Sequence, residues 1–314
     1  MKTRKLGAAG PELTEIGLGT WAIGGSWQFG WGPSDNAESI KTIQRALDLG
    51  INWIDTAAAY GLGHSEEIVG KAVKDRRQDI YIATKCGLRW NEKGKVHNNL
   101  SPDSIRKEVE DSLKRLQTDV IDLYQIHWPD PSRSTEKAWR EMSTLQKEGK
   151  VRWIGVSNFN VKQMETCEAI QHIDSLQPPY SILEPDAEKD LFPFCRKKDI
   201  GVVAYSPMAS GLLTGSFEKS KLAKDDWRQR DPRFQEPRLS RVLSLVEELR
   251  TIAQKYQKTV AQLAIAWVLR HPAVTSAIVG ARRVDQVEQN VGGAGWTLEQ
   301  QDISRIDELM AELL

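Results

Sequence analysis

Short apolar runs alternate with longer segments of helical periodicity along the chain. Runs of four to eight apolar residues are typical of buried strands. Such runs lie at Glu15–Leu18, Asn52–Ile54, Ile80–Ala83, Ile121–Gln125, Trp153–Val156, Ser175–Gln177, Val202–Tyr205 and Ser276–Ile278. The amphipathic segments that follow them predict helices at Ser34–Leu49, Ser65–Lys74, Ser101–Leu116, Thr135–Lys147, Val161–Gln171, Asp186–Lys198, Val260–Arg270 and Val284–Asn290.

Local signals support the helix boundaries. Ser101-Pro102 places a capping hydroxyl before a proline at the first helical position. Gly50 and Gly149 lie where two helices are expected to end. Capping and terminating residues therefore support the predicted alternation of strands and helices independently of the hydrophobic pattern.

Eight strand–helix units can form either a doubly wound sheet or a closed barrel. We favour the barrel, since a closed ring of eight strands has no exposed edge. The predicted fold class is α/β, a (β/α)8 TIM barrel with extra helices. A strand at Arg4–Leu6 is expected to pair with Glu15–Leu18 through the turn Gly7–Pro11, forming a hairpin that plugs the N-terminal end of the barrel.

The regular pattern breaks between Tyr205 and Lys258. This stretch holds Gly211–Gly215, the charged run Lys219–Arg233 and a helix expected near Arg241–Tyr256. A long insertion between barrel elements indicates a functional segment at the barrel mouth. Because no Ser/Pro-rich linker interrupts the chain, we expect one domain over residues 1–314.

Composition limits the possible partners. The 43 basic and 43 acidic residues balance, which argues against nucleic-acid binding because such binding needs a basic surface. No apolar run is long enough to cross a membrane, and no secretory signal is visible. Three scattered cysteines favour a reducing cytoplasm. The expected partner is a small molecule, and the chain is expected to be a monomer or weak oligomer.

Polar residues gather where three neighbouring strands end. Asp55 and Tyr60 follow the second strand, Lys85 the third and His127 the fourth. In a barrel, the loops at the C-terminal ends of the strands build the active site. Taken singly, Asp55 could cap a helix, Tyr60 could pack, Lys85 could form a surface ion pair or a Schiff base, and His127 could be a core residue.

At this point the chain resembles the aldo-keto reductases over essentially its whole length. The motifs are IGLGTW (16–21), DTAAAYG (55–61), TK (84–85), SLKRLQTDVIDLYQIHWPD (112–130), GVSNF (155–159) and GAR (280–282). The wording is most similar to bacterial members of the general-stress and inositol-operon type. The resemblance implies NADPH-dependent reduction of an aldehyde or ketone.

Carbonyl reduction explains the four polar residues. Hydride addition builds negative charge on the carbonyl oxygen, and Tyr60 suits the role of proton donor. Lys85 is expected to lower the pKa of Tyr60, and Asp55 to hold Lys85. His127 is expected to donate to the carbonyl oxygen.

The other half of the barrel offers a cofactor surface. Ser157, Asn158 and Gln177 supply polar groups for a carboxamide, and the ring of Tyr205 could stack on nicotinamide. The resemblance assigns these four residues to the nicotinamide. It also implies cofactor contacts by Gly19, Thr20, Trp21, Asp55, Ser206, Pro207, Met208, Ser210, Gly211, Leu212, Gly280, Ala281, Gln286, Gln289 and Asn290.

Arg282 is the candidate for the 2′-phosphate of NADPH, at the start of a helix that favours phosphate; the alternative is a solvated helix start. Many family members carry P-K-S where this chain has Val279-Gly280-Ala281, so one phosphate-binding lysine is absent. A second departure is Pro185, where close relatives have arginine.

Aromatic residues crowd the predicted barrel mouth. Trp21, Trp27, Trp31, Trp90 and Trp128 are the candidate substrate contacts, and they predict a pocket for apolar or aromatic aldehydes. The flanking segment Asn91–Asn99 is either a loop that closes over substrate or plain exposed chain.

Four other interpretations are less well supported. Gly61–Glu66 resembles a dinucleotide-binding loop, but Glu66 replaces the third glycine and would repel phosphate. The five histidines lack metal-binding spacing, so no metal is expected. A cofactor-sensing regulatory barrel and a lysine-based lyase remain as alternatives to the reductase.

Overall fold

A closed ring of eight parallel strands forms the centre of the molecule. The computed structural model describes all 314 residues. Around the ring the strands are β3 (Ile16–Gly19), β4 (Trp53–Asp55), β5 (Tyr81–Cys86), β8 (Ile121–Ile126), β9 (Val151–Ser157), β10 (Ser175–Gln177), β11 (Gly201–Tyr205) and β12 (Val274–Gly280). This confirms the predicted (β/α)8 barrel.

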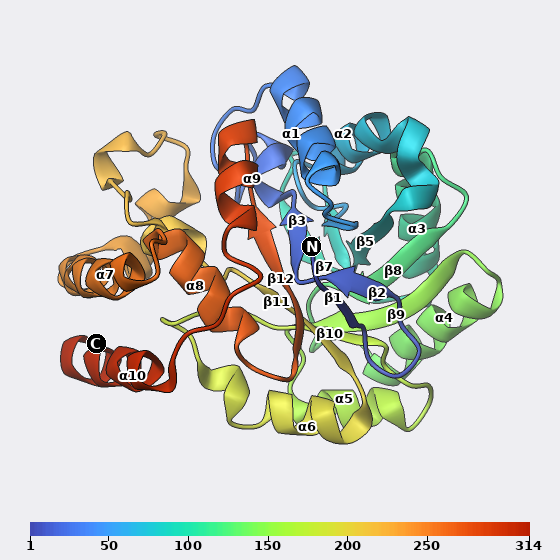
Figure 1. Ribbon diagram of the computed structural model, residues 1–314. Helices are drawn as coiled ribbons and strands as arrows, with labels where there is room; N and C mark the ends of the chain where they lie inside the picture. The colour runs from blue at the N-terminus through green and yellow to red at the C-terminus, as the bar shows by residue number, and fades with distance from the viewer.

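Eight helices surround the ring (Figure 1). They are α1 (Asn36–Asp48), α2 (His64–Val73), α3 (Pro102–Leu116), α4 (Thr135–Lys147), α5 (Val161–Glu168), α6 (Leu191–Lys198), α8 (Val260–Leu269) and α9 (Val284–Val291). The largest apolar cluster, 63 buried residues, lies mainly between strands and helices. The Ser101 side chain accepts from the N–H of Ser104, so the predicted cap of α3 is confirmed.

The expected helix Asp186–Lys198 is broken. A short 3-10 turn covers Asp186–Glu188, and α6 begins only at Leu191. Pro193 lies in the first turn of α6, where a proline is tolerated because its missing N–H has no helical acceptor. An α-helix that began at Asp186 would place this proline in its interior.

An antiparallel hairpin of β1 (Thr3–Lys5) and β2 (Glu12–Thr14) lies across the N-terminal end of the barrel, at the front of Figure 1. Leu6 and Leu13 pack there against Trp53 from inside the barrel. The predicted plug is therefore present, but its pairing was predicted wrongly. The first barrel strand, which begins at Ile16, pairs instead with β12 and β4.

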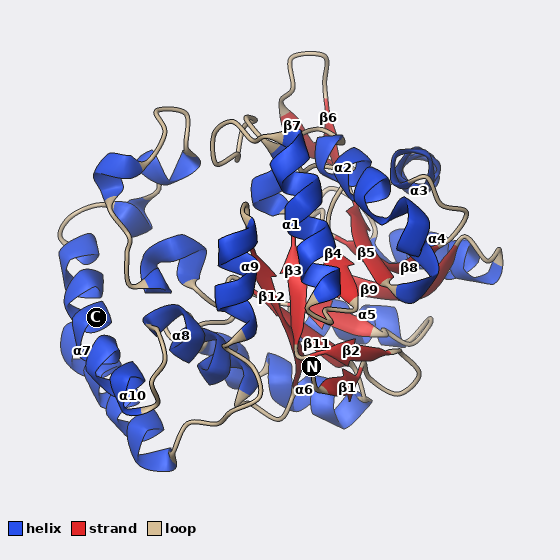
Figure 2. Cartoon of the chain, turned by 45° about the horizontal axis from the view of Figure 1, so that its top comes forward, coloured by secondary structure: helices blue, strands red, loops and turns tan.

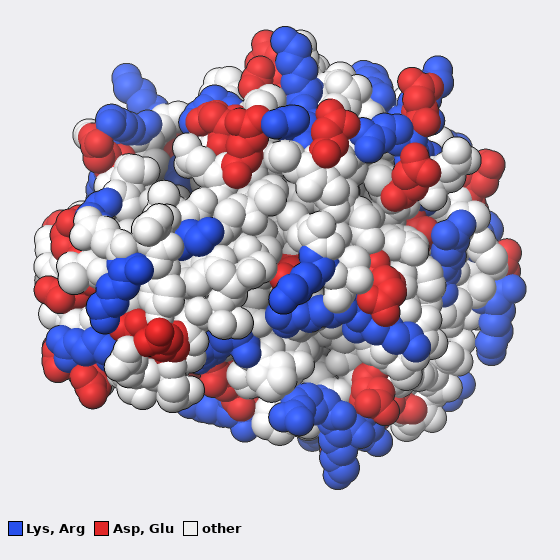
Figure 3. Space-filling view, viewed as in Figure 1, with Lys and Arg blue, Asp and Glu red and all other residues white.

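Additional elements complete the chain. α7 (Arg238–Lys255) ends the long insertion and packs against α8 and against α10 (Gln300–Leu313). The segment Asn91–Asn99, expected as a loop, contains the strand β7 (Val96–Asn98), which pairs with β6 (Leu88–Trp90) just before that segment. This second hairpin projects at the top of Figure 2. No helix combines the length and apolar character that a membrane span requires. On the face in Figure 3, basic and acidic side chains are interspersed.

Candidate active site

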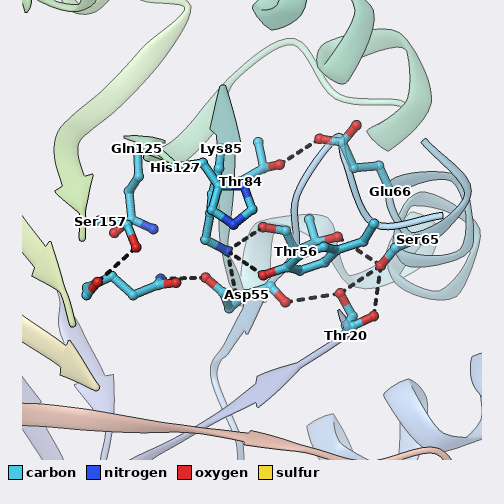
Figure 4. A network of polar contacts seen from close by, with 12 residues as sticks. Thr20, Asp55, Thr56, Ser65, Glu66, Thr84, Lys85, Gln125, His127 and Ser157 are labelled. Atoms are coloured by element: carbon cyan, nitrogen blue, oxygen red, sulfur yellow. Dashed lines mark hydrogen bonds and ion pairs between the residues drawn. The ribbon is translucent and has the colours of Figure 1, made fainter. Parts of the chain in front are cut away.

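Lys85 lies at the centre of the predicted catalytic group. Its ammonium donates to Asp55 Oδ2 at 2.7 Å, to the carbonyl of Thr56 at 2.9 Å and to Tyr60 Oη at 3.2 Å. Figure 4 shows Lys85 directed at Asp55 and Thr56, with the His127 ring beside it. The His127 ring meets the Tyr60 ring edge-to-face, with centroids 5.7 Å apart. The structure therefore brings all four predicted residues together.

These contacts orient the Tyr60 hydroxyl. An ammonium has three N–H donors and no acceptor, and all three are used here. Tyr60 Oη consequently accepts from Lys85, and its own proton can point into the adjoining cleft. This geometry is compatible with the expected role of Tyr60 as a proton donor.

The pKa values of Tyr60, Lys85 and His127 are all shifted by burial, and the shift of Tyr60 differs from the expected one. Burial, and secondly the Asp55 carboxylate, raise the pKa of Tyr60 well above its usual value. The expected net lowering of the Tyr60 pKa is therefore wrong, because burial, and after it the Asp55 carboxylate, act in the opposite direction. Burial lowers the pKa of Lys85, which Asp55 partly restores. Burial and the Lys85 charge hold the pKa of His127 well below its usual value, so the imidazole is neutral.

The loop that carries Tyr60 is held by close backbone packing. Gly61 has φ +62°, and a Cβ there would lie 2.0 Å from the carbonyl oxygen of Gly24. Only glycine allows this approach. Behind the loop, the hydroxyl of Ser65 lies 2.9 Å from that of Thr56 and donates to that of Thr20 at 2.8 Å.

This packing changes the role of Thr20. The side chain is completely buried and donates to the backbone carbonyl of Asp55 at 3.0 Å. Its hydroxyl is engaged by Asp55 away from the cleft, and the cofactor contact expected for Thr20 stays a prediction. Thr20 instead supports the residue that holds Lys85.

A cleft of about 860 Å³ opens above the Tyr60 hydroxyl. Trp21, Trp27 and Trp128 line it, as predicted. Trp31 and Trp90 do not. The Arg228 guanidinium lies 3.9 Å from the Trp31 ring centroid, and Trp90 lies in β6 with its ring facing Arg115.

Sequence reasoning missed other residues of the cleft wall. Leu88, Val96 and Asn98 come from the β6–β7 hairpin. The run Val96-His97-Asn98 has a single apolar residue followed by two polar ones, so it carries no alternation that would predict a strand. Glu184 and Arg233 add charge at the rim.

The four residues assigned to nicotinamide line the same cleft and bond to one another. The Tyr205 hydroxyl donates to Asn158 Oδ1 at 2.9 Å, and Asn158 Nδ2 donates to the carbonyl of His127 at 2.9 Å. Ser157 Oγ donates to the carbonyl of Gln177 at 2.8 Å, and Gln177 Nε2 donates to Asp55 Oδ1 at 2.8 Å. The residues assigned to the nicotinamide and the four candidate catalytic residues thus form one polar network.

The segment after β11 turns sharply. Ser206, Ala209, Ser210 and Gly211 all have positive φ values, and Ser206 and Ser210 line the cleft. Leu212, predicted to face the cofactor, is buried in a small apolar cluster with Phe234. The sequence motif alone does not indicate that the Leu212 side chain packs against this apolar cluster.

The predicted phosphate end lies at the start of α9. Arg282 donates to the carbonyl of Trp31 at 3.0 Å and also to that of Pro33. Its backbone N–H donates to Gln286 Oε1, and Asn290 donates to the carbonyl of Gly280. These residues come together as expected, but part of the Arg282 guanidinium binds the first loop.

Two other candidate chemistries can be assessed on this geometry. Glu66 is completely buried, accepting from Thr84 Oγ1 at 2.6 Å and from Arg115 Nε at 2.6 Å. It is a buried anchor beneath the start of α2, not part of a phosphate loop. No group of three or more His, Cys, Asp or Glu residues has the geometry of a metal site.

Comparisons with known proteins agree with this geometry. The sequence model of the aldo/keto reductase family matches residues 15–311. The aldo-keto reductase YhdN of Bacillus subtilis strain 168 is 43% identical over 314 residues, which cover 99% of this chain and 94% of that protein. The NADH-specific methylglyoxal reductase of Escherichia coli K12 is 37% identical over 334 aligned residues, covering 100% and 99%.

Solved structures show the same likeness. The glycerol dehydrogenase AKR11B4 of Gluconobacter oxydans superposes with a TM-score of 0.90 at 41% identity, covering 99% of this chain and 95% of that one. The holo form of the aldo-keto reductase AKR11C1 of Bacillus halodurans gives a TM-score of 0.83 at 31% identity, covering 98% and 96%. The chain therefore belongs to the aldo/keto reductase family, whose members generally reduce carbonyl compounds with a nicotinamide cofactor.

Proposed function

We propose that this chain reduces aldehydes and ketones to alcohols with NADPH, and that Tyr60 is the general acid. The observation that carries the proposal is the contact between Lys85 Nζ and Tyr60 Oη at the floor of an aromatic cleft. It orients the Tyr60 proton toward the space where a carbonyl oxygen would lie.

The residues fit a nicotinamide cofactor. Ser157, Asn158 and Gln177 place amide and hydroxyl groups on one side of the cleft, and the hydrogen-bonded Tyr205 ring forms a fixed flat wall. When bound, the reduced nicotinamide supplies the hydride. The protein's task is then to orient the carbonyl group, stabilise its oxygen and protonate it.

The proton steps follow from the contacts. As the carbonyl carbon gains hydride, the C=O π electrons move to oxygen, and the neutral His127 ring donates an N–H toward that oxygen. Tyr60 transfers its proton, which forms the alcohol O–H bond and leaves a phenolate. The Lys85 ammonium stabilises this phenolate through the same contact. Reprotonation of Tyr60 restores the starting state.

The proposal is tested by NADPH oxidation with 4-nitrobenzaldehyde. Because a general acid contributes roughly 10²- to 10⁴-fold, Tyr60→Phe is expected to lower kcat by at least about 100-fold. Its NADPH affinity, from quenching of tryptophan fluorescence, is expected to stay within about threefold of the wild type. Unimpaired reduction by Tyr60→Phe would exclude the assigned role.

The choice of NADPH is supported by Arg282. A guanidinium has five N–H donors, and two carbonyl oxygens accept from this one. The remaining donors are available for a 2′-phosphate at the start of α9. Because one relative is named as NADH-specific, the preference of this chain for NADPH over NADH has to be measured directly.

Arg282→Gln is expected to weaken NADPH binding about 10- to 100-fold, since each charge-assisted hydrogen bond contributes roughly 1.5–3 kcal/mol, and to change NADH binding much less. The measurement is the dissociation constant of each cofactor. Equal losses for both would mean that Arg282 only holds the first loop.

The lyase alternative conflicts with the site. Lys85 is 1% exposed and uses all three N–H donors, whereas a Schiff base requires a free amine lone pair. Borohydride is therefore expected to trap no carbonyl compound on Lys85.

A further inference from the structure

One hydrogen bond crosses the interior of the barrel at the level of the active site. Gln177 ends β10 and Asp55 ends β4. In the ring order β10-β11-β12-β3-β4-β5-β8-β9, these two strands stand opposite each other. Gln177 Nε2 nevertheless reaches Asp55 Oδ1 at 2.8 Å. This bond links the nicotinamide half of the cleft to the proton-donating half.

The bond completes the anchoring of Asp55. Lys85 binds Oδ2 at 2.7 Å, and Gln177 binds Oδ1. Asp55 is 2% exposed and Gln177 3% exposed, so water does not readily replace either donor. With both oxygens engaged, the carboxylate plane is fixed, and with it the direction in which Lys85 points at Tyr60.

The bond also fixes the orientation of the amide. An ionised carboxylate only accepts hydrogen bonds, so Nε2 must face Asp55 and Oε1 must face elsewhere. No protein group donates to Oε1, and Gln177 lines the cleft. The backbone is held as well, because its carbonyl accepts from Ser157 Oγ and Pro178 follows. The side chain therefore offers the cleft an acceptor of fixed direction.

We propose that Gln177 is a positioning residue for Asp55, and that it couples cofactor seating to the Asp55–Lys85–Tyr60 alignment. This rests on the proposed function, in which a carboxamide N–H would meet Gln177 Oε1. The Gln177 amide would then accept from the cofactor through Oε1 and donate to the Asp55 carboxylate through Nε2.

A double-mutant cycle tests whether Gln177 acts through Asp55. Gln177→Met keeps the length of the side chain but removes the donor, and it is expected to lower kcat about 10- to 100-fold. In an Asp55→Asn background, the same change is expected to lower kcat by no more than about threefold. Independent, multiplying losses would overturn the proposal.

Gln125→Met is the matched control. Gln125 is also completely buried inside the barrel, but its only side-chain partner is Ser175. A change of kcat below about threefold is expected. Circular dichroism and thermal unfolding of each variant establish that it is folded.

The pH dependence of Gln177→Glu separates two roles of the amide. At about pH 8, the introduced carboxylate cannot donate and repels Asp55, whereas its protonated form at lower pH can donate. The ratio of variant to wild-type kcat is therefore expected to rise at least about tenfold toward pH 6. If Gln177 only accepted from cofactor, the carboxylate would serve well at high pH and the ratio would fall with acid.

A further readout requires no turnover. Because Asp55→Asn permits the Gln177 amide to rotate, NADPH affinity is expected to fall about three- to tenfold in Asp55→Asn, but not further when Gln177→Met is added. If adding Gln177→Met to Asp55→Asn lowered NADPH affinity further, the coupling between the two residues would be contradicted. A wild type that binds NADPH with the expected coupling, yet reduces no carbonyl compound, would overturn the proposed function and leave the coupling intact.

Discussion

Glu66 acts on Lys85 from behind the strand. It is completely buried and bonds to Thr84, the neighbour of Lys85 in β5 (Figure 4). Its carboxylate raises the pKa of Lys85 against the larger lowering by burial. Since Lys85 must be protonated to donate to Tyr60, the alkaline limit of activity depends on this second carboxylate.

Under the proposed function, Glu66→Gln is therefore expected to move the alkaline fall of kcat to lower pH, because it removes a carboxylate that raises the pKa of Lys85. The measurement is kcat from neutral to alkaline pH. The control Glu67→Gln, an exposed neighbour, should leave the profile unchanged. If the alkaline fall of kcat moved to higher pH in Glu66→Gln, the electrostatic role of Glu66 would be contradicted.

Glu108 makes stability depend on pH. Burial raises its pKa to about 7, although the carboxylate accepts from the N–H of Gly87 and from Ser104. Because the folded pKa exceeds the unfolded one, folding favours the protonated form. Ionised Glu108 therefore lowers the free energy of unfolding. This loss of stability is absent below the unfolded pKa and complete above about pH 7.

The difference in unfolding free energy between wild type and Glu108→Gln is thus expected to change in favour of the variant as pH rises from about 4.5 to about 7. Chemical denaturation at several pH values measures it. A difference that is constant with pH would show that Glu108 does not titrate in this range.

The sequence predicted that Asp55, Tyr60, Lys85 and His127 would meet at one site because each follows a barrel strand. It did not predict that Thr20 is buried, or that burial and the Asp55 carboxylate together raise the pKa of Tyr60. Both depend on distances of a few ångströms between segments remote in sequence. Motif order carries no such information.

At the scale of elements, the β6–β7 hairpin forms a wall of the cleft. Gly87 at its base has φ +90°, and a Cβ there would lie 2.4 Å from Leu100 Cδ2. The hairpin contributes Leu88 and Val96 to the cleft, and its hydrogen bonds to Gln28 and to the carbonyl of Pro129 involve no residue assigned to the cofactor. Its placement should therefore affect substrate and not cofactor.

Gly87→Ala is expected to raise the KM for aromatic aldehydes about three- to tenfold, because strained backbone of this kind amounts to about 1–3 kcal/mol. NADPH affinity should be unchanged. Lys93→Ala, at the exposed tip, is the control. A variant that instead loses NADPH binding would mean that the hairpin also shapes the cofactor half.

Elements with strong periodicity were predicted within a few residues, as α4 at Thr135–Lys147 illustrates. The pairing of β1 was not, because a strand of three residues has no pattern that distinguishes Glu12–Thr14 from Glu15–Leu18. The break before α6 had a signal in Pro193, which the apolar spacing obscured.

At the scale of the molecule, stability and chemistry occupy opposite ends of the barrel. Leu6 and Leu13 seal the N-terminal end, whereas the catalytic group lies where the strands end. A change in the plug should consequently weaken the fold without altering the reaction.

Leu6→Ala is expected to lower the unfolding free energy by about 2–5 kcal/mol, the usual range for a buried leucine, with kcat within about twofold of wild type at a temperature where the variant is folded. Denaturant titration and steady-state kinetics measure the two effects. Glu12→Ala, on the exposed side of the hairpin, is the control. A large loss of kcat in folded Leu6→Ala would show that the two ends communicate.

The stretch between Trp21 and Pro33 has one more consequence. Trp21 and Trp27 form part of the cleft wall, while the carbonyls of Trp31 and Pro33 bind Arg282. Under the proposed function, a single short run of chain would thus border both reactants. We therefore expect a nucleotide held at Arg282 to stabilise the surface on which the aldehyde rests, and turnover to follow an order in which the nucleotide is first to arrive and last to depart.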